Sequence, residues 1–221
     1  MEPEPRPPED ADVGVLSAEV RAELRGLSPD NADRVGRHLV AAGELLDDDP
    51  LRALAHARAA RRTAARLAAV REAVGVAAYL SGQWQEALTE LRAVRRMAGG
   101  SDYLPLLADC ERGLGRPERA LELARSPEAS QLSTADRAEL RIVEAGARRD
   151  LGQVEAALLV LQDAGLDPAE AEEWTIRLWY AYADTLLAAG RRDEARHWFQ
   201  AVVVADEAQS TDAADRLSSL D

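Results

Sequence analysis

One short pattern recurs along the chain and constrains its fold more than any other feature. A glycine or aspartate follows one helical stretch, and five residues later an alanine lies near the start of the next. The pattern occurs at Gly82 with Ala87, Gly115 with Ala120, Gly152 with Ala157, Gly190 with Ala195 and, with aspartate, at Asp48 with Ala53. Successive alanines are therefore 34, 33, 37 and 38 residues apart. A period of this size is typical of solenoids built from helical hairpins.

Helix start and stop signals predict five hairpins, at about residues 30–63, 64–98, 101–126, 133–165 and 169–206. We expect a helix at 211–220 to cap the array, and Ser17 to begin a short helix that precedes it. Residues 1–14 contain four prolines and five acids, which indicates a disordered acidic tail. The chain contains no run of alternating β-branched residues, so no strand is predicted. The sequence therefore predicts a single all-α domain over residues 15–221.

The composition agrees with thin helical layers. Hydrophobic residues make up 47% of the chain but aromatic residues only 4%, so most apolar side chains are small. All 27 basic residues are arginine, which is typical of a GC-rich genome such as an actinobacterial one. The net charge of −13 disfavours general binding to nucleic acid or to anionic membranes.

The compartment follows from the cysteine count and the apolar segments. One cysteine, Cys110, occurs in the chain, which favours a reducing compartment. Residues 1–8 lack the apolar stretch of a signal peptide. The longest apolar run, residues 156–161, is too short to cross a bilayer. We therefore expect a cytoplasmic protein with no membrane partner.

Aligned with one another, the hairpins resemble those of the tetratricopeptide repeat (TPR) family. The fifth matches best, with a tryptophan early in its first helix, a glycine at the turn and an alanine early in its second helix. The residues at matching packing positions are Gly75, Gly82, Ala87, Gly115, Ala120, Gly152, Ala157, Trp179, Ala183, Gly190, Ala195 and Phe199. The resemblance spans about residues 30–206 and implies a right-handed superhelix. The family's usual first-helix tyrosine is missing from four hairpins, so another array of α-hairpins remains the alternative.

The TPR resemblance also implies that the first helix of each hairpin lines a concave groove that holds a peptide. Transferring the groove positions gives His38, Glu72, Tyr79, Asp102, Asp109, Arg112, Glu139, Arg149, Arg177, Tyr180 and Asp184. Acids slightly outnumber bases in this set, which favours a basic or amphipathic segment as the partner. The alternative is that these are ordinary solvated side chains. The family's clamp for chaperone tails is not expected, because it needs lysine, which this chain lacks.

A second candidate surface is basic. Residues 51–96 hold nine arginines against three glutamates. We define the basic belt as Arg58, Arg61, Arg62, Arg66, Arg92, Arg95 and Arg96. Such a belt could bind RNA phosphates, an acidic partner or the acidic tail of the chain itself. Alternatively, these arginines pair with acids of adjacent hairpins.

The remaining chemically notable residues suggest packing. Four tryptophans, Trp84, Trp174, Trp179 and Trp198, are expected in the core, although Trp174 could form a stacking surface with Tyr180. Residues 47–49 are three consecutive aspartates, and negative charge at the start of a helix is a sufficient reason for them.

No catalytic or metal-binding arrangement stands out. His38, His56 and His197 are isolated, and Cys110 has no companion for a metal site. We therefore expect no enzymatic activity, cofactor, metal or small-molecule substrate. The leading hypothesis is a scaffold that binds a protein segment, and the alternative is an RNA- or ribosome-associated factor that uses the basic belt.

Overall fold

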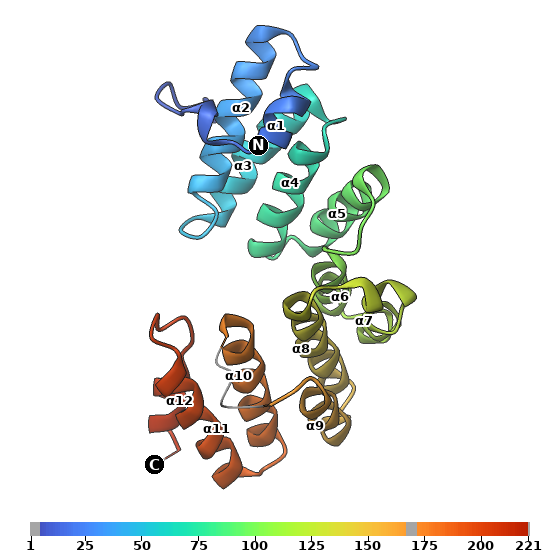
Figure 1. Cartoon of the computed structure of the whole chain (residues 1–221), viewed down its shortest axis with the longest axis vertical. Helices are drawn as coiled ribbons and strands as arrows, with labels where there is room; N and C mark the ends of the chain where they lie inside the picture. The colour runs from blue at the N-terminus through green and yellow to red at the C-terminus, as the bar shows by residue number, and fades with distance from the viewer. Residues whose placement is uncertain (1–4, 167–171, 221) are drawn as a thin grey trace. The chain divides into compact units, whose positions relative to one another are not determined.

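The computed structural model describes residues 5–166 and 172–220, and these residues contain helices but no strand (Figure 1). Two 3-10 turns, η1 (Val13–Val15) and η2 (Pro127–Gln131), accompany the α-helices. The α-helices are α1 (Ala18–Leu24), α2 (Pro29–Glu44), α3 (Pro50–Ala64), α4 (Ala68–Leu80), α5 (Trp84–Ala98), α6 (Leu104–Gly113), α7 (Pro117–Ala124), α8 (Thr134–Asp150), α9 (Val154–Asp163), α10 (Glu173–Ala188), α11 (Arg192–Ala205) and α12 (Ala213–Ser218). The prediction of an all-α fold is confirmed. None of the described helices is both long and apolar enough to cross a bilayer.

Within each unit, helices that follow one another in the sequence pack side by side. The main helix contacts are those of α2 with α3, α3 with α4, α4 with α5, α8 with α9, and α10 with α11. The chain divides into two compact units, Met1–Leu114 and Gly115–Asp221. The boundary falls inside the third predicted hairpin, between α6 and α7. The single domain over residues 15–221 stays a prediction.

The recurring glycines end the first helix of a hairpin in a left-handed conformation. Gly82, Gly152 and Gly190 have φ angles of 71°, 73° and 76°. The N–H of Gly82 donates to the Tyr79 carbonyl (3.0 Å), and the N–H of the next residue donates to the Ala78 carbonyl (2.7 Å). The same two hydrogen bonds recur at Gly152 and Gly190. This is the Schellman arrangement, which favours glycine because a β-carbon is disfavoured at positive φ.

The recurring alanines lie where paired helices touch. The side chains of Ala53, Ala87, Ala157 and Ala195 are all 0% exposed. On the facing first helices of the second unit, Ala183 is 0% exposed and Ala145 is 2% exposed. Ala120 lies on α7, which packs against α8, and is also 0% exposed. At Gly75 of α4, an added β-carbon would lie 2.7 Å from the Leu91 Cδ2 atom of α5. These helices therefore approach too closely for larger side chains at such positions.

The described residues at the N-terminus contact α2. Residues 1–4 lie outside the described residues, but the Glu9 carbonyl accepts a hydrogen bond from the Arg37 guanidinium (2.7 Å). The predicted short helix is α1, and the Ser17 hydroxyl caps it by accepting from the Val20 N–H (3.3 Å). Part of the stretch predicted as a disordered tail therefore has a defined contact with the first hairpin.

One carboxylate organises the turn between α11 and α12. Asp206, the C-cap of α11, accepts hydrogen bonds from the N–H and hydroxyl groups of Ser210 (2.9 and 2.8 Å) and Thr211 (2.8 and 2.7 Å). These bonds favour the charged form, so the Ser210 N–H and the Thr211 hydroxyl lower the pKa of Asp206 to about 2.

We predict that Asp206→Asn destabilises the second unit in a pH-dependent way, because an amide cannot accept all four bonds. The native pKa of Asp206 lies below its unfolded value, so its contribution is complete above about pH 4. That contribution falls as the pH drops towards 2. Thermal unfolding should show a lower Tm for Asp206→Asn at pH 6 and a smaller difference from the parent at pH 3. The control Glu207→Gln, at the exposed next residue, should show neither effect; a pH-independent Asp206→Asn difference contradicts this account.

Candidate functional site

Three predicted groove residues of the first unit lie on α4 and α6 and bond to one another. The Tyr79 hydroxyl of α4 donates to the Asp109 carboxylate of α6 (2.8 Å), and the Arg112 guanidinium donates to the same carboxylate (2.9 Å). Two turns earlier on α4 lies Glu72, and burial, followed by a hydrogen bond to Glu72, raises the pKa of Tyr103, the N-cap of α6. Consecutive first helices are therefore joined by polar side chains along one face.

The second unit repeats this arrangement on α8, α10 and α12. Asp184 of α10 lies between two arginines: it pairs with Arg149 of α8 (2.7 Å) and with Arg216 of α12. Nearer the start of α10, Arg177 pairs with Glu139 of α8 (2.8 Å). The Tyr180 hydroxyl bonds to Asp212, the N-cap of α12. Burial, followed by this hydrogen bond, raises the pKa of Tyr180 to about 12.

We call these two rows the first-helix faces. They consist of Glu72, Tyr79, Asp102, Asp109 and Arg112 in the first unit and of Glu139, Arg149, Arg177, Tyr180 and Asp184 in the second. In the first unit the row holds three acids, Glu72, Asp102 and Asp109, against Arg112, and Asp102 is exposed. In the second unit the acids and arginines balance through the pairs described above. All the predicted groove residues except His38 therefore lie on one of these two faces.

The exception is His38, which is 0% exposed and so unavailable to a peptide in a groove. Its Nδ1 atom lies 3.1 Å from the Nδ1 atom of His56, across the contact between α2 and α3. His56 is also buried, and burial, followed by the nearby charge of Arg52, lowers its pKa. The TPR alignment used residue spacing alone, so it could not show that His38 is buried. The burial of His38 depends on its partner His56, which lies on another helix, α3.

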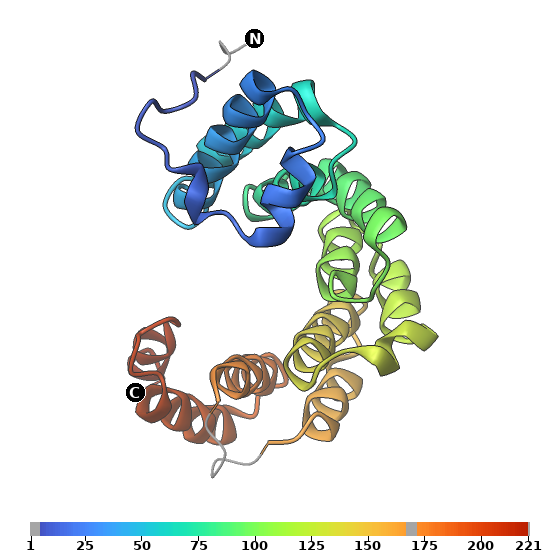
Figure 2. The same cartoon turned by 45° about the horizontal axis from the view of Figure 1, so that its top comes forward.

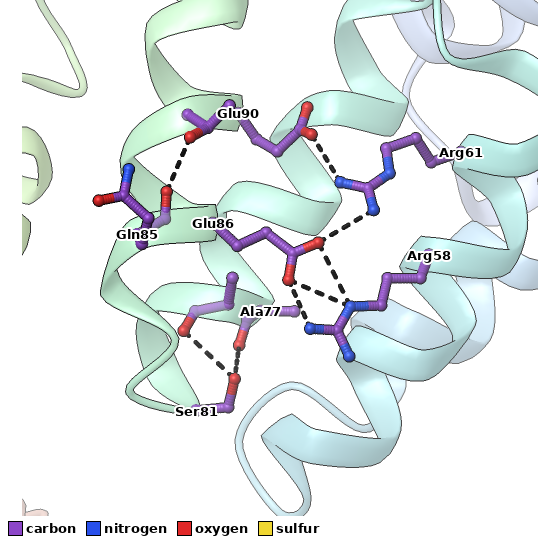
Figure 3. Close-up of polar contacts among 9 residues, drawn as sticks. Arg58, Arg61, Ala77, Ser81, Gln85, Glu86 and Glu90 are labelled. Carbon is purple, nitrogen blue, oxygen red and sulfur yellow. Dashed lines mark hydrogen bonds and ion pairs between the residues drawn. The ribbon is translucent and has the colours of Figure 1, made fainter. Parts of the chain in front are cut away.

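Two arginines of the basic belt, Arg58 and Arg61, belong to an ion-pair cluster between α3, α4 and α5 (Figure 3). Glu86 of α5 pairs with Arg58 (2.5 Å) and Arg61 (3.0 Å) of α3. Glu90, one turn further along α5, pairs with Arg61 (2.6 Å) and with Arg71 of α4 (2.7 Å). Only 7% of the Glu90 side chain is exposed. The hydrogen bonds from Arg58, together with the charges of both α3 arginines, outweigh burial and lower the pKa of Glu86.

The remaining belt arginines divide into three groups. Arg92 of α5 pairs with Glu111 of α6 (2.7 Å), a carboxylate whose side chain is 1% exposed. Arg66 and Arg96 are exposed, while Arg62 and Arg95 each make a further interaction. The interpretation in which the belt pairs with acids of adjacent hairpins therefore holds for Arg58, Arg61 and Arg92.

The sequence analysis did not predict that a carboxylate of this cluster is buried and holds the helices together. Glu90 falls between Leu88 and Leu91 on the apolar side of α5, and all three are buried. The sequence did contain a signal, because Glu90 occupies an apolar position of the helical period. A carboxylate buried at such a position needs a charged or hydrogen-bonding partner.

A cavity of about 570 Å³ opens beside the ion-pair cluster in the first unit. Arg61, Glu86 and Glu90 form its polar wall, and Trp84 and Leu114 contribute apolar surface. The Trp84 ring packs edge-on against Tyr79, with ring centroids 5.5 Å apart. An added β-carbon at Gly113 would lie 2.7 Å from that ring. Trp84 therefore joins α4, α5 and α6, in agreement with a packing role.

The other tryptophans also pack. Trp179 is 1% exposed, and Trp198 contacts it and the ring of Tyr182. Trp174 packs against the same core as a partly buried side chain. The Tyr180 ring contacts Phe199, with centroids 5.6 Å apart, which supports the packing interpretation over a stacking surface.

Two residues considered for chemistry have structural surroundings. Cys110 is buried, and burial raises its pKa to about 12, so the thiol stays protonated at neutral pH. Asp49 caps α3, because its carboxylate accepts from the Arg52 N–H (3.1 Å).

No protein-family model matches the chain, and no curated protein matches it at a significant level.

We predict that Glu90→Ala destabilises the protein by about 1–3 kcal/mol, because it leaves two partly buried arginines without their shared carboxylate. Chemical denaturation followed by circular dichroism measures the change. The control is Glu122→Ala, which removes an exposed glutamate from α7 and should change stability by less than about 0.5 kcal/mol. Equal effects of the two substitutions would show that the cluster is only a surface network.

Proposed function

We propose that this chain is a non-enzymatic TPR-like scaffold that binds a segment of a partner protein on its first-helix faces. Support for the TPR-like part comes from the repeated left-handed glycines and the fully buried alanines of the helix pairs. A right-handed superhelix is part of this proposal. So is a cytoplasmic location, which the single buried cysteine favours.

The observation that carries the binding proposal is the alignment of polar side chains on consecutive first helices. In the first unit, Tyr79, Asp109 and Arg112 are partly exposed, while Asp102 is exposed. Their mutual hydrogen bonds fix their positions, so a partner would meet a pre-ordered polar surface, which lowers the entropy lost on binding. Because acids outnumber arginines on this face, a partner segment with basic side chains fits it best.

The ion pairs of α3, α4 and α5 weigh against the RNA alternative. Arg58, Arg61 and Arg71 already neutralise Glu86 and Glu90. Phosphates would have to compete with carboxylates at hydrogen-bonding distance. The net charge of −13 adds long-range repulsion of nucleic acid.

The proposal is tested by replacing single residues with a photo-crosslinking amino acid in the cell of origin. The probe at Asp102 reports on the first-helix face of the first unit, and the probe at Arg96 reports on the exposed part of the basic belt. We expect mass spectrometry to identify a protein crosslinked from position 102 and not from position 96. Binding of that protein to Asp102→Arg should weaken about five- to tenfold, because a basic partner then meets a like charge.

Two outcomes would contradict the proposal. One is the absence of a protein crosslink from position 102 when the probe at position 96 captures a partner. The other is a gel shift with bulk cellular RNA that Arg96→Ala weakens, which the RNA alternative predicts.

A further inference from the structure

The N-terminal segment of the chain lies on the first helices of the first two hairpins. η1 packs against α2, and α1 contacts both α2 and α4 (Figure 2). Val13, Leu16, Val20 and Leu27 cover a cluster that includes Val35 and Leu39 of α2 and Val70 of α4, and Leu24 belongs to that cluster. The segment therefore occupies a surface made by α2 and α4, which we call the α2–α4 face.

Gly36 of α2 shapes the deepest part of the α2–α4 face. A β-carbon at this position would lie 2.7 Å from the Val13 Cγ1 atom and 3.4 Å from the Leu24 Cδ1 atom. Two side chains of the segment therefore fill the space that the glycine leaves open. Leu24 is 4% exposed, so it is the most buried residue of α1.

A carboxylate fixes the segment to the start of α4. Glu23 accepts a hydrogen bond from the Ala69 N–H, with 3.3 Å between Oε2 and N. The N-cap of α4 is Leu67, which has no side chain able to cap the helix. Glu23 thus supplies from α1 the acceptor that α4 lacks, at the positive end of that helix.

The segment shows the pattern of a helix that docks in a groove. Val20 and Leu24 are four residues apart and share one face of α1, while Leu16 and Leu27 flank the helix and pack against the same cluster. Arg21 and Arg25 are exposed. The docked helix has seven residues, too few to be stable by itself, so it depends on its contacts with the rest of the chain.

We propose that the α2–α4 face is a docking site for an amphipathic helix of a partner protein and that residues 13–27 are its resident competitor. The partner helix carries apolar residues four apart and a carboxylate just before the one that enters beside Gly36, as Glu23 precedes Leu24. This inference rests on the proposed function, of which it specifies one site and the ligand chemistry there. A short tether gives the resident segment an effective concentration in the millimolar range, so it weakens binding of any free helix in proportion to its occupancy.

The test uses the full chain and a fluorescent peptide of residues 12–28 as the probe. Leu24→Asp in the chain removes the buried anchor of the resident segment and leaves the α2–α4 face unchanged. We expect the peptide to bind this variant at least tenfold more tightly than the parent chain, as measured by fluorescence anisotropy. A peptide with Glu23→Gln should bind the same variant several-fold more weakly, because it loses the charged cap for α4.

Gly36→Ala provides the matched control on the receiving side. It favours the helical form of α2 but places a methyl group against Val13 of the peptide. Added to Leu24→Asp, it should weaken peptide binding at least fivefold while circular dichroism shows unchanged helix content. Glu23→Arg in the chain is a second way to release the segment if Leu24→Asp fails to fold.

Peptide binding that is no tighter to the folded, released variants than to the parent overturns the inference. Binding that Gly36→Ala leaves unchanged overturns it too, because the peptide then docks elsewhere. The crosslink from position 102 does not depend on either result. A partner captured there without peptide binding here removes this inference alone, whereas peptide binding without that partner removes the proposed function of the acidic face.

Discussion

Paired helices in this chain meet where both partners carry alanine or glycine, and the rest of the structure depends on that contact. Burying one alanine stabilises the fold by only about 1 kcal/mol, so no single residue holds a pair together. What the small side chains allow is a short distance between helix axes, at which neighbouring leucines such as Leu91 and Leu158 become completely or almost completely buried. Close approach of the helices thus gives a chain with few aromatic residues a dense interior.

The second consequence of thin layers is that charged residues lie close to every interface. Glu90, Glu111 and Glu144 are buried, and each is paired with one or two arginines. Burying such carboxylates costs free energy that their partners offset. The pairs of Glu90 and Glu111 join neighbouring helices, whereas both arginine partners of Glu144 lie on its own helix, α8. Arginine suits this role because its planar group bonds to two acceptors at once, as Arg61 does with Glu86 and Glu90.

The sequence predicted what depends on local geometry. The glycine at each turn and the alanine five residues later follow from backbone conformation and helix spacing, and the structure places both as expected at Gly82 and Ala87, for example. Features set by distant partners were out of reach. The burial of His38 depends on His56, the capping of α4 depends on Glu23, and the order of the final turn depends on Asp206. The division of the chain between α6 and α7 also depends on contacts that no local pattern encodes.

The most direct test of close packing at the repeated alanines is the stability of Ala157→Leu compared with Ala188→Leu. Ala157 is 0% exposed at the contact between α8 and α9, whereas Ala188 is exposed at the end of α10. The account predicts that Ala157→Leu destabilises the protein by about 1–3 kcal/mol or more, because the added atoms force the helices apart. Ala188→Leu should change stability by less than about 0.5 kcal/mol. Equal stability of the two variants would contradict the central claim, since it would mean that the repeated alanine fills no tight contact.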